Sequence, residues 1–236
     1  MAEPLVLLPG MMCDARLFGP QIAELSSEFS VMLSPVTRGE RIEEIASGLL
    51  DELPQKFALA GLSMGGIVAM ELLRRAPDRV TRLALLDTSP LAETPPAAAA
   101  REPQIVKVRS GQMHAVVRDE LLPTYLGPGP YREEISELVL DMADALGPDV
   151  FVRQSRALQR RRDQQGTLSK CRVPTLVLCG EHDELCPVKR HQIMAEMIPG
   201  AELRVLPTAG HLPTLEAPAE TTQALRDWMR QPLILR

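Results

Sequence analysis

Short, nearly continuous apolar runs recur along the chain, separated by longer segments in which apolar residues return every three or four positions. Runs of the first kind predict buried strands, and segments of the second kind predict amphipathic helices. The predicted strands cover residues 4–10, 29–35, 56–61, 81–87, 174–180 and 201–207. The predicted helices that alternate with them cover residues 41–53, 64–75, 188–197 and 218–229.

Buried strands that alternate with helices are typical of an α/β fold, in which a parallel sheet is covered on both faces. The pattern therefore predicts a mostly parallel, doubly wound sheet of six strands. In such sheets, ligands bind beyond the carboxyl ends of the strands. Functional residues are then expected in the loops that begin at Pro9, Gly61, Asp87, Gly180 and Pro207.

Residues 88–173 interrupt the alternation, because no strand candidate stands out among them. They open with a proline- and alanine-rich stretch, "SPLAETPPAAAARE", which we interpret as a linker. Apolar residues then return at helical spacing, and Pro148 is suited to the first turn of a further helix. We predict a core formed by residues 1–87 and 174–236, with residues 88–173 inserted as a helical cap over the strand ends.

The composition narrows the classes of function that this fold could carry. With 45% hydrophobic residues, 24% charged residues and a net charge of −5, the chain is suited to a soluble domain and not to general nucleic-acid binding. Its apolar stretches are shorter than the roughly 20 residues of a membrane span, and its first residues lack the pattern of a secretory signal. We expect a cytoplasmic protein whose partner is a small-molecule substrate, without nucleic acid or membrane.

The four cysteines, Cys13, Cys171, Cys179 and Cys186, have neither CxxC spacing nor the density of a disulfide scaffold. We expect reduced thiols, no metal and no cofactor. Aromatic residues make up 3% of the chain, whereas there are 11 methionines, so a pocket is expected to have an aliphatic and thioether lining. Such a lining favours small or flexible substrates over ring systems.

A serine stands at the junction between the third predicted strand and its helix. The sequence Gly61-Leu62-Ser63-Met64-Gly65 fits G-x-S-x-G, the strand-to-helix elbow that presents a serine hydroxyl above a sheet. The glycines let strand and helix approach closely, and the helix N-terminus directs N–H groups towards the serine. The alternative is a tight turn whose serine only caps the helix. The strand before it and the helix after it favour the elbow.

A serine hydroxyl needs a general base to act as a nucleophile, and histidine is the usual one. His211 follows a predicted strand, in "PTAGHLPTLEAP", and is the base that we favour. His182 lies near another such loop. His114 and His191 lie within predicted helices, where we expect ordinary surface or packing roles.

A carboxylate that orients the histidine is expected on a loop after a late strand. Asp183, in "LVLCGEHDELCP", lies beyond the glycine that ends the fifth predicted strand. The resulting order Ser63, Asp183, His211 is that of an α/β-hydrolase. Asp87, after the fourth strand, is the second choice, and Glu181 is a weaker candidate for the same role.

Acyl transfer also needs N–H donors for the oxyanion that develops on the substrate carbonyl. We expect one from the residue after the nucleophile, Met64, and the second from the loop after the first strand, at Met11. Nothing in the sequence around Cys13 or Cys186 supports either thiol as a nucleophile.

These stretches resemble the α/β-hydrolase superfamily, and in particular its small bacterial esterase-like members with a helical cap. The resemblance extends over essentially the full chain and rests on "LLPGMMCDARLFGPQIAEL", "LAGLSMGGIVAMELLRRAPDRVTRLALLDTSP", "VPTLVLCGEHDELCPV" and "LPTAGHLPTLEAP". It implies that Ser63, Asp183 and His211 form a catalytic triad, with Met11 and Met64 as the oxyanion donors. Many relatives have His-Gly where this chain has Pro-Gly at positions 9 and 10, so the loop must be braced without that histidine.

The resemblance does not identify a substrate, because one fold hosts many activities. We predict a serine hydrolase that cleaves a small carboxylic ester, lactone or thioester through an acyl-enzyme on Ser63. The alternatives are a C–C bond hydrolase and a non-catalytic ligand-binding protein of the same fold. A cluster of five arginines, which could attract an anionic substrate, is interpreted as a solvated helix face; its members are Arg153, Arg156, Arg160, Arg161 and Arg162.

Overall fold

Six parallel strands form one sheet at the centre of the protein, in a computed structural model that describes residues 3–233. The strands are β1 (Leu5–Leu8), β2 (Val31–Leu33), β3 (Phe57–Leu62), β4 (Val80–Leu86), β5 (Thr175–Gly180) and β6 (Glu202–Leu206). Their spatial order is β2-β1-β3-β4-β5-β6, and every neighbouring pair is parallel. The predicted six-stranded α/β sheet is confirmed. The first two residues, where no secretory signal is predicted, lie outside the described residues.

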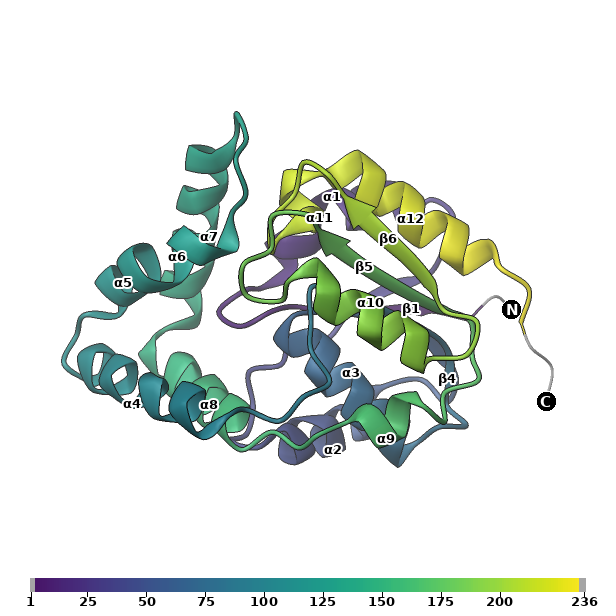
Figure 1. The fold of residues 1–236 in the computed structure, drawn as a ribbon, viewed down its shortest axis with the longest axis horizontal. Coiled ribbons are helices and arrows are strands. Elements are labelled where there is room, and N and C mark those ends of the chain that lie inside the picture. Colours follow the sequence, from purple (N-terminus) through teal and green to yellow (C-terminus); the bar gives the residue numbers. More distant parts are fainter. Residues whose placement is uncertain (1–2, 234–236) are drawn as a thin grey trace.

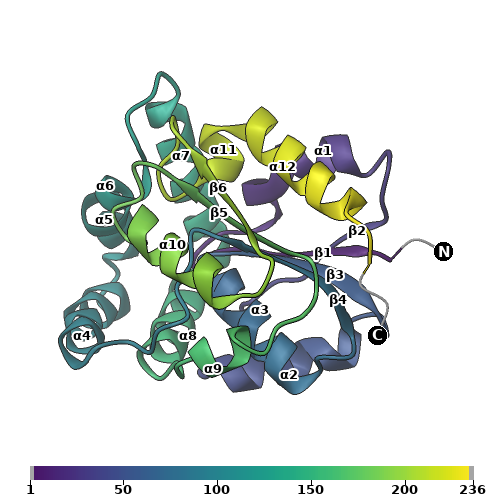
Figure 2. The ribbon, with the colours of Figure 1, turned by 45° about the vertical axis from the view of Figure 1, so that its right-hand side comes forward.

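Helices cover both faces of the sheet (Figures 1 and 2). One face carries α1 (Gly19–Leu25), α11 (Pro213–Glu216) and α12 (Pro218–Arg230), with a 3-10 turn η1 (Ala15–Phe18) before α1. The other carries α2 (Ile42–Glu52), α3 (Met64–Arg75) and α10 (Val188–Met197). Because both faces are covered, all residues of β1, β3 and β5 are buried, as their continuous apolar runs predict.

The segment between β4 and β5 contains helices only among its described residues. They are α4 (Pro95–Arg109), α5 (Met113–Val116), the π-helical turn η2 (Val117–Leu121), α6 (Leu122–Tyr125), α7 (Arg132–Leu146), α8 (Pro148–Gln159) and α9 (Gln165–Leu168). In Figure 1, α4 to α8 (teal) lie beyond the end of the sheet towards which the strand arrows point. The predicted cap boundaries at residues 88 and 173 stay a prediction. No helix in the described part of the chain is long and apolar enough to cross a membrane.

The expected linker at the start of this segment is wrong, because most of it is the first part of α4. Thr94 caps the helix, its side chain accepting a hydrogen bond from the Ala97 N–H. The two prolines that suggest a linker occupy the first turn, where a missing N–H costs nothing, and alanines with the highest helix propensity follow. Ile105 and Val108, further along α4, are buried.

Candidate active site

Ser63 lies on a strained turn between β3 and α3. Its backbone has φ of 54° and ψ of −114°, a left-handed conformation that is unusual for a residue with a side chain. The glycines on either side are required by close packing. A Cβ at Gly61 would lie 2.3 Å from the Gly65 carbonyl oxygen, and a Cβ at Gly65 would lie 2.1 Å from the Leu8 carbonyl oxygen. The glycine spacing therefore brings β3, the start of α3 and the end of β1 together around Ser63.

Thr88, at the end of β4, holds this turn from the side. Its hydroxyl donates a hydrogen bond to the Ser63 carbonyl oxygen at 2.7 Å, and its backbone N–H donates to His191 Nε2 at 3.1 Å. His191 is fully buried, and burial lowers its pKa to about 4, so its ring is a neutral acceptor. The role of Thr88 was not visible in the sequence, because the contact joins β4 to the β3–α3 turn.

Ser63, His211 and Asp183 form a continuous chain of hydrogen bonds. His211 Nε2 lies 2.8 Å from Ser63 Oγ, and His211 Nδ1 lies 2.9 Å from Asp183 Oδ2. A carboxylate only accepts, so Nδ1 carries the ring proton and Nε2 is free to accept from the serine hydroxyl. The structure thus brings together the three residues that the sequence singles out.

Asp183 is held as an ionised acceptor. Its Oδ1 accepts hydrogen bonds from the N–H groups of Leu185 and Cys186, both at 2.9 Å, which leaves Oδ2 for His211. Burial alone raises the pKa of this carboxyl, but the hydrogen bond and charge of His211 and the Cys186 N–H lower it to about 2. Glu181, the weaker candidate, is exposed and makes no side-chain contact with the histidine.

Asp87 does not bond to His211 and occupies a second carboxyl position behind Asp183. It is fully buried, and its Oδ1 accepts the Gly180 N–H at 2.9 Å. No donor among residues 3–233 reaches its Oδ2, and a buried carboxylate oxygen without a donor favours a proton on Asp87. Burial and the neighbouring charge of Asp183 raise the pKa of Asp87 well above its usual range, which is consistent with that proton.

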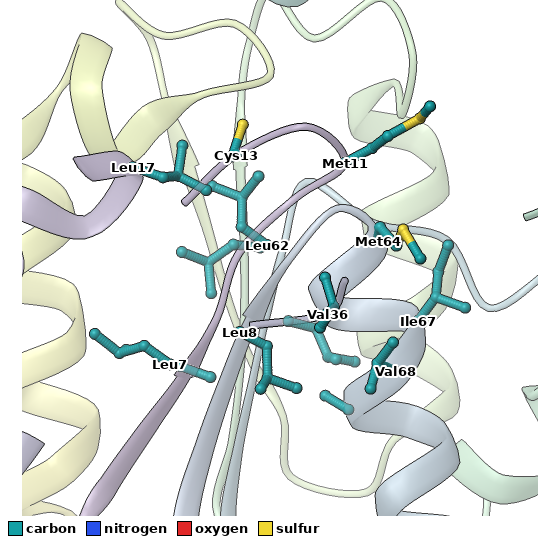
Figure 3. Close-up of a cluster of buried hydrophobic side chains, with 14 of the residues drawn as sticks. Leu7, Leu8, Met11, Cys13, Leu17, Val36, Leu62, Met64, Ile67 and Val68 are labelled. Atoms are coloured by element: carbon teal, nitrogen blue, oxygen red, sulfur yellow. The ribbon is translucent and has the colours of Figure 1, made fainter. Parts of the chain in front are cut away.

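The loop after β1 lies directly against the serine turn. A Cβ at Gly10 would be 3.5 Å from Ser63 Cβ, and Figure 3 shows this loop arching over the end of β3 and the start of α3. The Met11 N–H makes no backbone hydrogen bond within the described chain, and Met64 is the first residue of α3, where N–H groups lack an intrahelical acceptor. Both predicted oxyanion donors therefore remain available.

The backbone of Met12 anchors this loop to the helical segment. Its φ is 55°, and its N–H donates a 2.9 Å hydrogen bond to Gln154 Oε1 on α8. Gln154 is fully buried, and its Nε2 donates to the Val36 carbonyl oxygen at 3.1 Å. The helical segment thus fixes the loop that contains Pro9 and Gly10. Nothing in the local sequence of α8 indicates this contact.

Two further residues that sequence reasoning missed hold the His211 loop. The Tyr125 carbonyl oxygen accepts the His211 N–H at 2.7 Å, and the two rings have centroids 5.3 Å apart. Glu216 accepts the N–H groups of Gly127 and Leu212 at 2.7 and 2.9 Å. Tyr125 belongs to α6, so its contact depends on how the helical segment folds back onto the core.

One group of described residues has the composition of a metal site. Ligand atoms of Asp183, Cys186 and His211 lie within 4.8 Å of one another. Burial, with the charge of Asp183, raises the pKa of the Cys186 thiol to about 12, which disfavours the thiolate that metals prefer. Burial also raises the pKa of Cys13 to about 12, so neither thiol is suited to nucleophilic attack. These three residues therefore fit the hydrogen bonds that link Ser63, His211 and Asp183 better than they fit a metal site.

Ser63 and His211 open into a cavity of about 330 Å³ between the sheet ends and the helical segment. Its apolar wall includes Met11, Ile67 and Leu158, in keeping with the aliphatic lining that the composition predicts. The remaining histidines lie outside it: His114 is half-exposed beside Asp144 and the His182 backbone pairs with Ala209. The reactive groups are therefore reached from one cavity whose wall is partly aliphatic and partly polar.

Comparison with known proteins agrees with this geometry. A sequence model of the α/β hydrolase family matches residues 5–224. An esterase from Thermogutta terrifontis, solved with malate bound, is similar in structure with a TM-score of 0.90 and 30% identity, over 98% of this chain and 90% of that chain. The enol-lactonase from Burkholderia xenovorans LB400 gives a TM-score of 0.86 and 25% identity, over 98% and 93%.

A curated relative points in the same direction. The pimeloyl-[acyl-carrier protein] methyl ester esterase of Aromatoleum aromaticum is 28% identical over 210 residues, which are 82% of each chain. The match to the family model covers nearly all of the described residues, and the sheet order and serine turn agree with it. The chain belongs to the α/β hydrolase family.

Proposed function

We propose that the protein is a serine hydrolase that cleaves a small carboxylic ester, with lactones and thioesters as chemically equivalent substrates. The observation that carries this proposal is the chain of hydrogen bonds from Ser63 through His211 to Asp183 at the wall of an enclosed cavity. The names of two relatives, a methyl ester esterase and an enol-lactonase, support the same acyl chemistry.

In the first step, Ser63 Oγ attacks the substrate carbonyl carbon while His211 Nε2 accepts the hydroxyl proton. The C=O electron pair moves onto oxygen, and the N–H groups of Met11 and Met64 stabilise the oxyanion. Asp183 stabilises the imidazolium that forms, because it is ionised and already bonded to Nδ1. The C–O bond then breaks, and the alcohol leaves with the proton from Nε2.

In the second step, water replaces the alcohol. His211 Nε2 accepts a proton from the water as its oxygen attacks the acyl-enzyme carbonyl, and the same N–H groups stabilise the second oxyanion. Ser63 leaves with the proton returned by His211, and the carboxylic acid is released.

A fluorophosphonate probe tests the proposal directly, because it labels only an activated serine. We expect the wild type to be labelled at Ser63, and Ser63→Ala to lose both the label and hydrolysis of p-nitrophenyl butyrate, the latter by on the order of 10⁶-fold. Ser89→Ala is the matched control, since Ser89 lines the same cavity without contacting His211. That variant should still be labelled at Ser63.

Two results would overturn the assignment. Labelling that persists in Ser63→Ala would mean that another residue is the nucleophile. Saturable ligand binding without any acyl-enzyme burst would instead mean that the chain is a non-catalytic member of the family.

A further inference from the structure

The cavity that contains Ser63 is lined by three arginines and one glutamate, in a protein whose net charge is −5. Arg101 comes from α4, Arg161 follows α8, and Arg190 belongs to α10. The only acidic residue in the lining is Glu93, which precedes α4. Figure 1 shows α4 and α8 side by side beyond the end of the sheet. Positive charge is therefore concentrated where a substrate would lie.

Glu93 cannot balance these arginines. A single oxygen, Oε2, lies 3.0 Å from Arg161 Nη1 and 3.3 Å from Arg101 Nη2. Arg190 has no carboxylate within 4.0 Å among residues 3–233, and its Nη1 donates only to the Leu185 carbonyl oxygen at 3.4 Å. Three guanidinium groups thus share one carboxylate, which leaves an excess of two positive charges in the lining.

Two of these arginines, which are partly buried, also keep N–H donors without an oxygen acceptor among residues 3–233. Arg161 spends Nε on the Leu91 carbonyl oxygen and Nη1 on Glu93, so Nη2 is left over. Arg101 Nη1 contacts only the Met11 sulfur, at 4.0 Å. A guanidinium group is the preferred partner of a planar carboxylate, because it offers N–H groups in a matching fork.

The Arg161 guanidinium is mostly buried beside two other arginines and shares its one carboxylate with Arg101. Its side chain is only 12% exposed, and burying a charge without a full partner costs free energy. Burial lowers the pKa of Arg161, Glu93 raises it, and the nearby positive charges of Arg101 and Arg190 lower it again. An anion in the cavity would relieve this repulsion.

The other arginines of the cluster seen in the sequence behave differently. Arg156 pairs with Glu102, and Arg160 and Arg162 lie 3.7 and 4.0 Å from Glu40 and Glu43. Arg160 and Arg162 are exposed, as the solvated-face interpretation predicts, whereas Arg153 and Arg156 are partly buried, with Arg153 donating to the Thr37 carbonyl oxygen. For Arg161 that interpretation is wrong, because the chain leaves α8 at residue 160 and turns this side chain inward.

We propose that the substrate is the monoester of a small dicarboxylic acid, whose free carboxylate binds Arg161 and Arg101 while its ester carbonyl lies at Ser63. The aliphatic wall formed by Met11, Ile67 and Leu158 contacts the methylene chain between the two ends. This inference rests on the proposed ester hydrolysis. It specifies in addition that the acyl chain of the substrate carries a negative charge.

Monomethyl adipate and dimethyl adipate test the proposal, because they differ only in whether the far end is charged. We expect kcat/KM to be about 10- to 100-fold higher for the monoester at low salt, the range of one charge-assisted hydrogen bond. The preference should shrink as salt screens the charges. Arg161→Gln should reduce the ratio of the two kcat/KM values about tenfold, and Arg161→Lys should retain part of it.

Arg160→Gln is the matched control, since Arg160 adjoins Arg161 in the chain but is half-exposed beside Glu40. It should keep the wild-type ratio. Equal kcat/KM values for the two esters, or a ratio that Arg161→Gln leaves unchanged, would overturn the carboxylate proposal while ester hydrolysis stands. If the wild type shows neither turnover of these esters nor fluorophosphonate labelling at Ser63, the proposed function itself is refuted.

A binding measurement decides the question without turnover. Titration calorimetry of the wild type should detect the binding of adipate, and adipamide is the uncharged control of equal length. We expect adipate to bind at least tenfold more tightly than adipamide, and Arg161→Gln to abolish that difference. Equal affinities would overturn the proposal even if no methyl ester were cleaved.

Discussion

Backbone strain in this protein is confined to the site. Within residues 3–233, three residues other than glycine have positive φ, namely Met12, Ser63 and Asp87. They follow β1, β3 and β4, which are neighbours in the sheet. Each one costs of the order of 1–3 kcal/mol of stability, so the surrounding contacts must hold them in place. At these positions the Ser63 hydroxyl reaches His211, the Met12 N–H donates to Gln154, and the Asp87 carboxyl group accepts the Gly180 N–H.

The first prediction concerns Asp87. The folded protein keeps the Asp87 proton at pH values where the unfolded chain, with a pKa near 3.8, has lost it. The free energy of unfolding of the wild type therefore falls as pH rises above about 4, by up to about 1.4 kcal/mol per pH unit for this group. Asp87→Asn cannot ionise, and its amide oxygen can still accept the Gly180 N–H. Its stability relative to the wild type should increase from pH 4 to pH 7.

Urea denaturation across that pH range measures the difference. Asp87→Leu is the control, because it removes the acceptor for the buried Gly180 N–H and should be destabilised at every pH. A gap between Asp87→Asn and the wild type that does not change with pH would show that Asp87 is ionised in the folded protein.

At this scale the sequence predicts the reactive residues better than the residues that position them. Ser63, Asp183 and His211 are indicated by residue type and by position after parallel strands, and the fold brings such positions together. Thr88 and Gln154 have no such signal. Their roles depend on hydrogen bonds to groups that are distant in the sequence, and a single sequence does not show which distant groups come together.

At the scale of elements, hydrophobic periodicity predicts a helix correctly where one of its faces is apolar. It fails where contacts with distant parts of the chain stabilise the helix. The predicted helices 64–75 and 188–197 match α3 and α10 at both ends. The helix α1, of seven residues, was not predicted, because it is short and buries a glutamine. Gln21 is stabilised by its side-chain bonds to the Thr214 and Pro218 carbonyls, which come from the far end of the chain.

The helix α8 provides the element-scale prediction. Gln154→Leu leaves the Met12 N–H and the Val36 carbonyl without their partner, which costs about 1–3 kcal/mol of stability for each group. The loop of Met11 then loses its fixed position. We expect kcat for p-nitrophenyl butyrate to fall about 10- to 100-fold with little change in KM, because a displaced donor weakens transition-state binding.

The matched control is Gln159→Leu, on the same helix, where the lost bonds go to Ala98, Glu102 and Arg156 at the partly exposed surface. Its kcat should stay at the wild-type value. Gln154→Glu should retain the acceptor for Met12 and give an intermediate kcat. If Gln154→Leu loses stability but keeps its kcat, the loop is held without α8.

At the scale of the whole molecule, a buried carboxylate joins the helical segment to the core. Glu71 on α3 is fully buried and accepts hydrogen bonds from Arg74, Arg75 and Gln164, all between 2.7 and 2.8 Å. Gln164 also donates its backbone N–H to the Pro90 carbonyl at 2.7 Å. The chain therefore leaves and re-enters the core at one place, which keeps the arginine-lined cavity in register with Ser63.

Acid unfolding tests this junction. Burial raises the pKa of Glu71, but hydrogen bonds from Arg74, Arg75 and Gln164 lower it to about 2, below the 4.5 of the unfolded chain. Its stabilisation is therefore complete above pH 4.5 and is lost as pH falls towards 2, by up to about 1.4 kcal/mol per pH unit. In urea denaturation, Glu71→Gln should lose stability at pH 7 and show a flatter decline below pH 4.5. Glu52→Gln, at an exposed ion pair, should keep the wild-type slope, and an equal slope in Glu71→Gln would contradict the role of this junction.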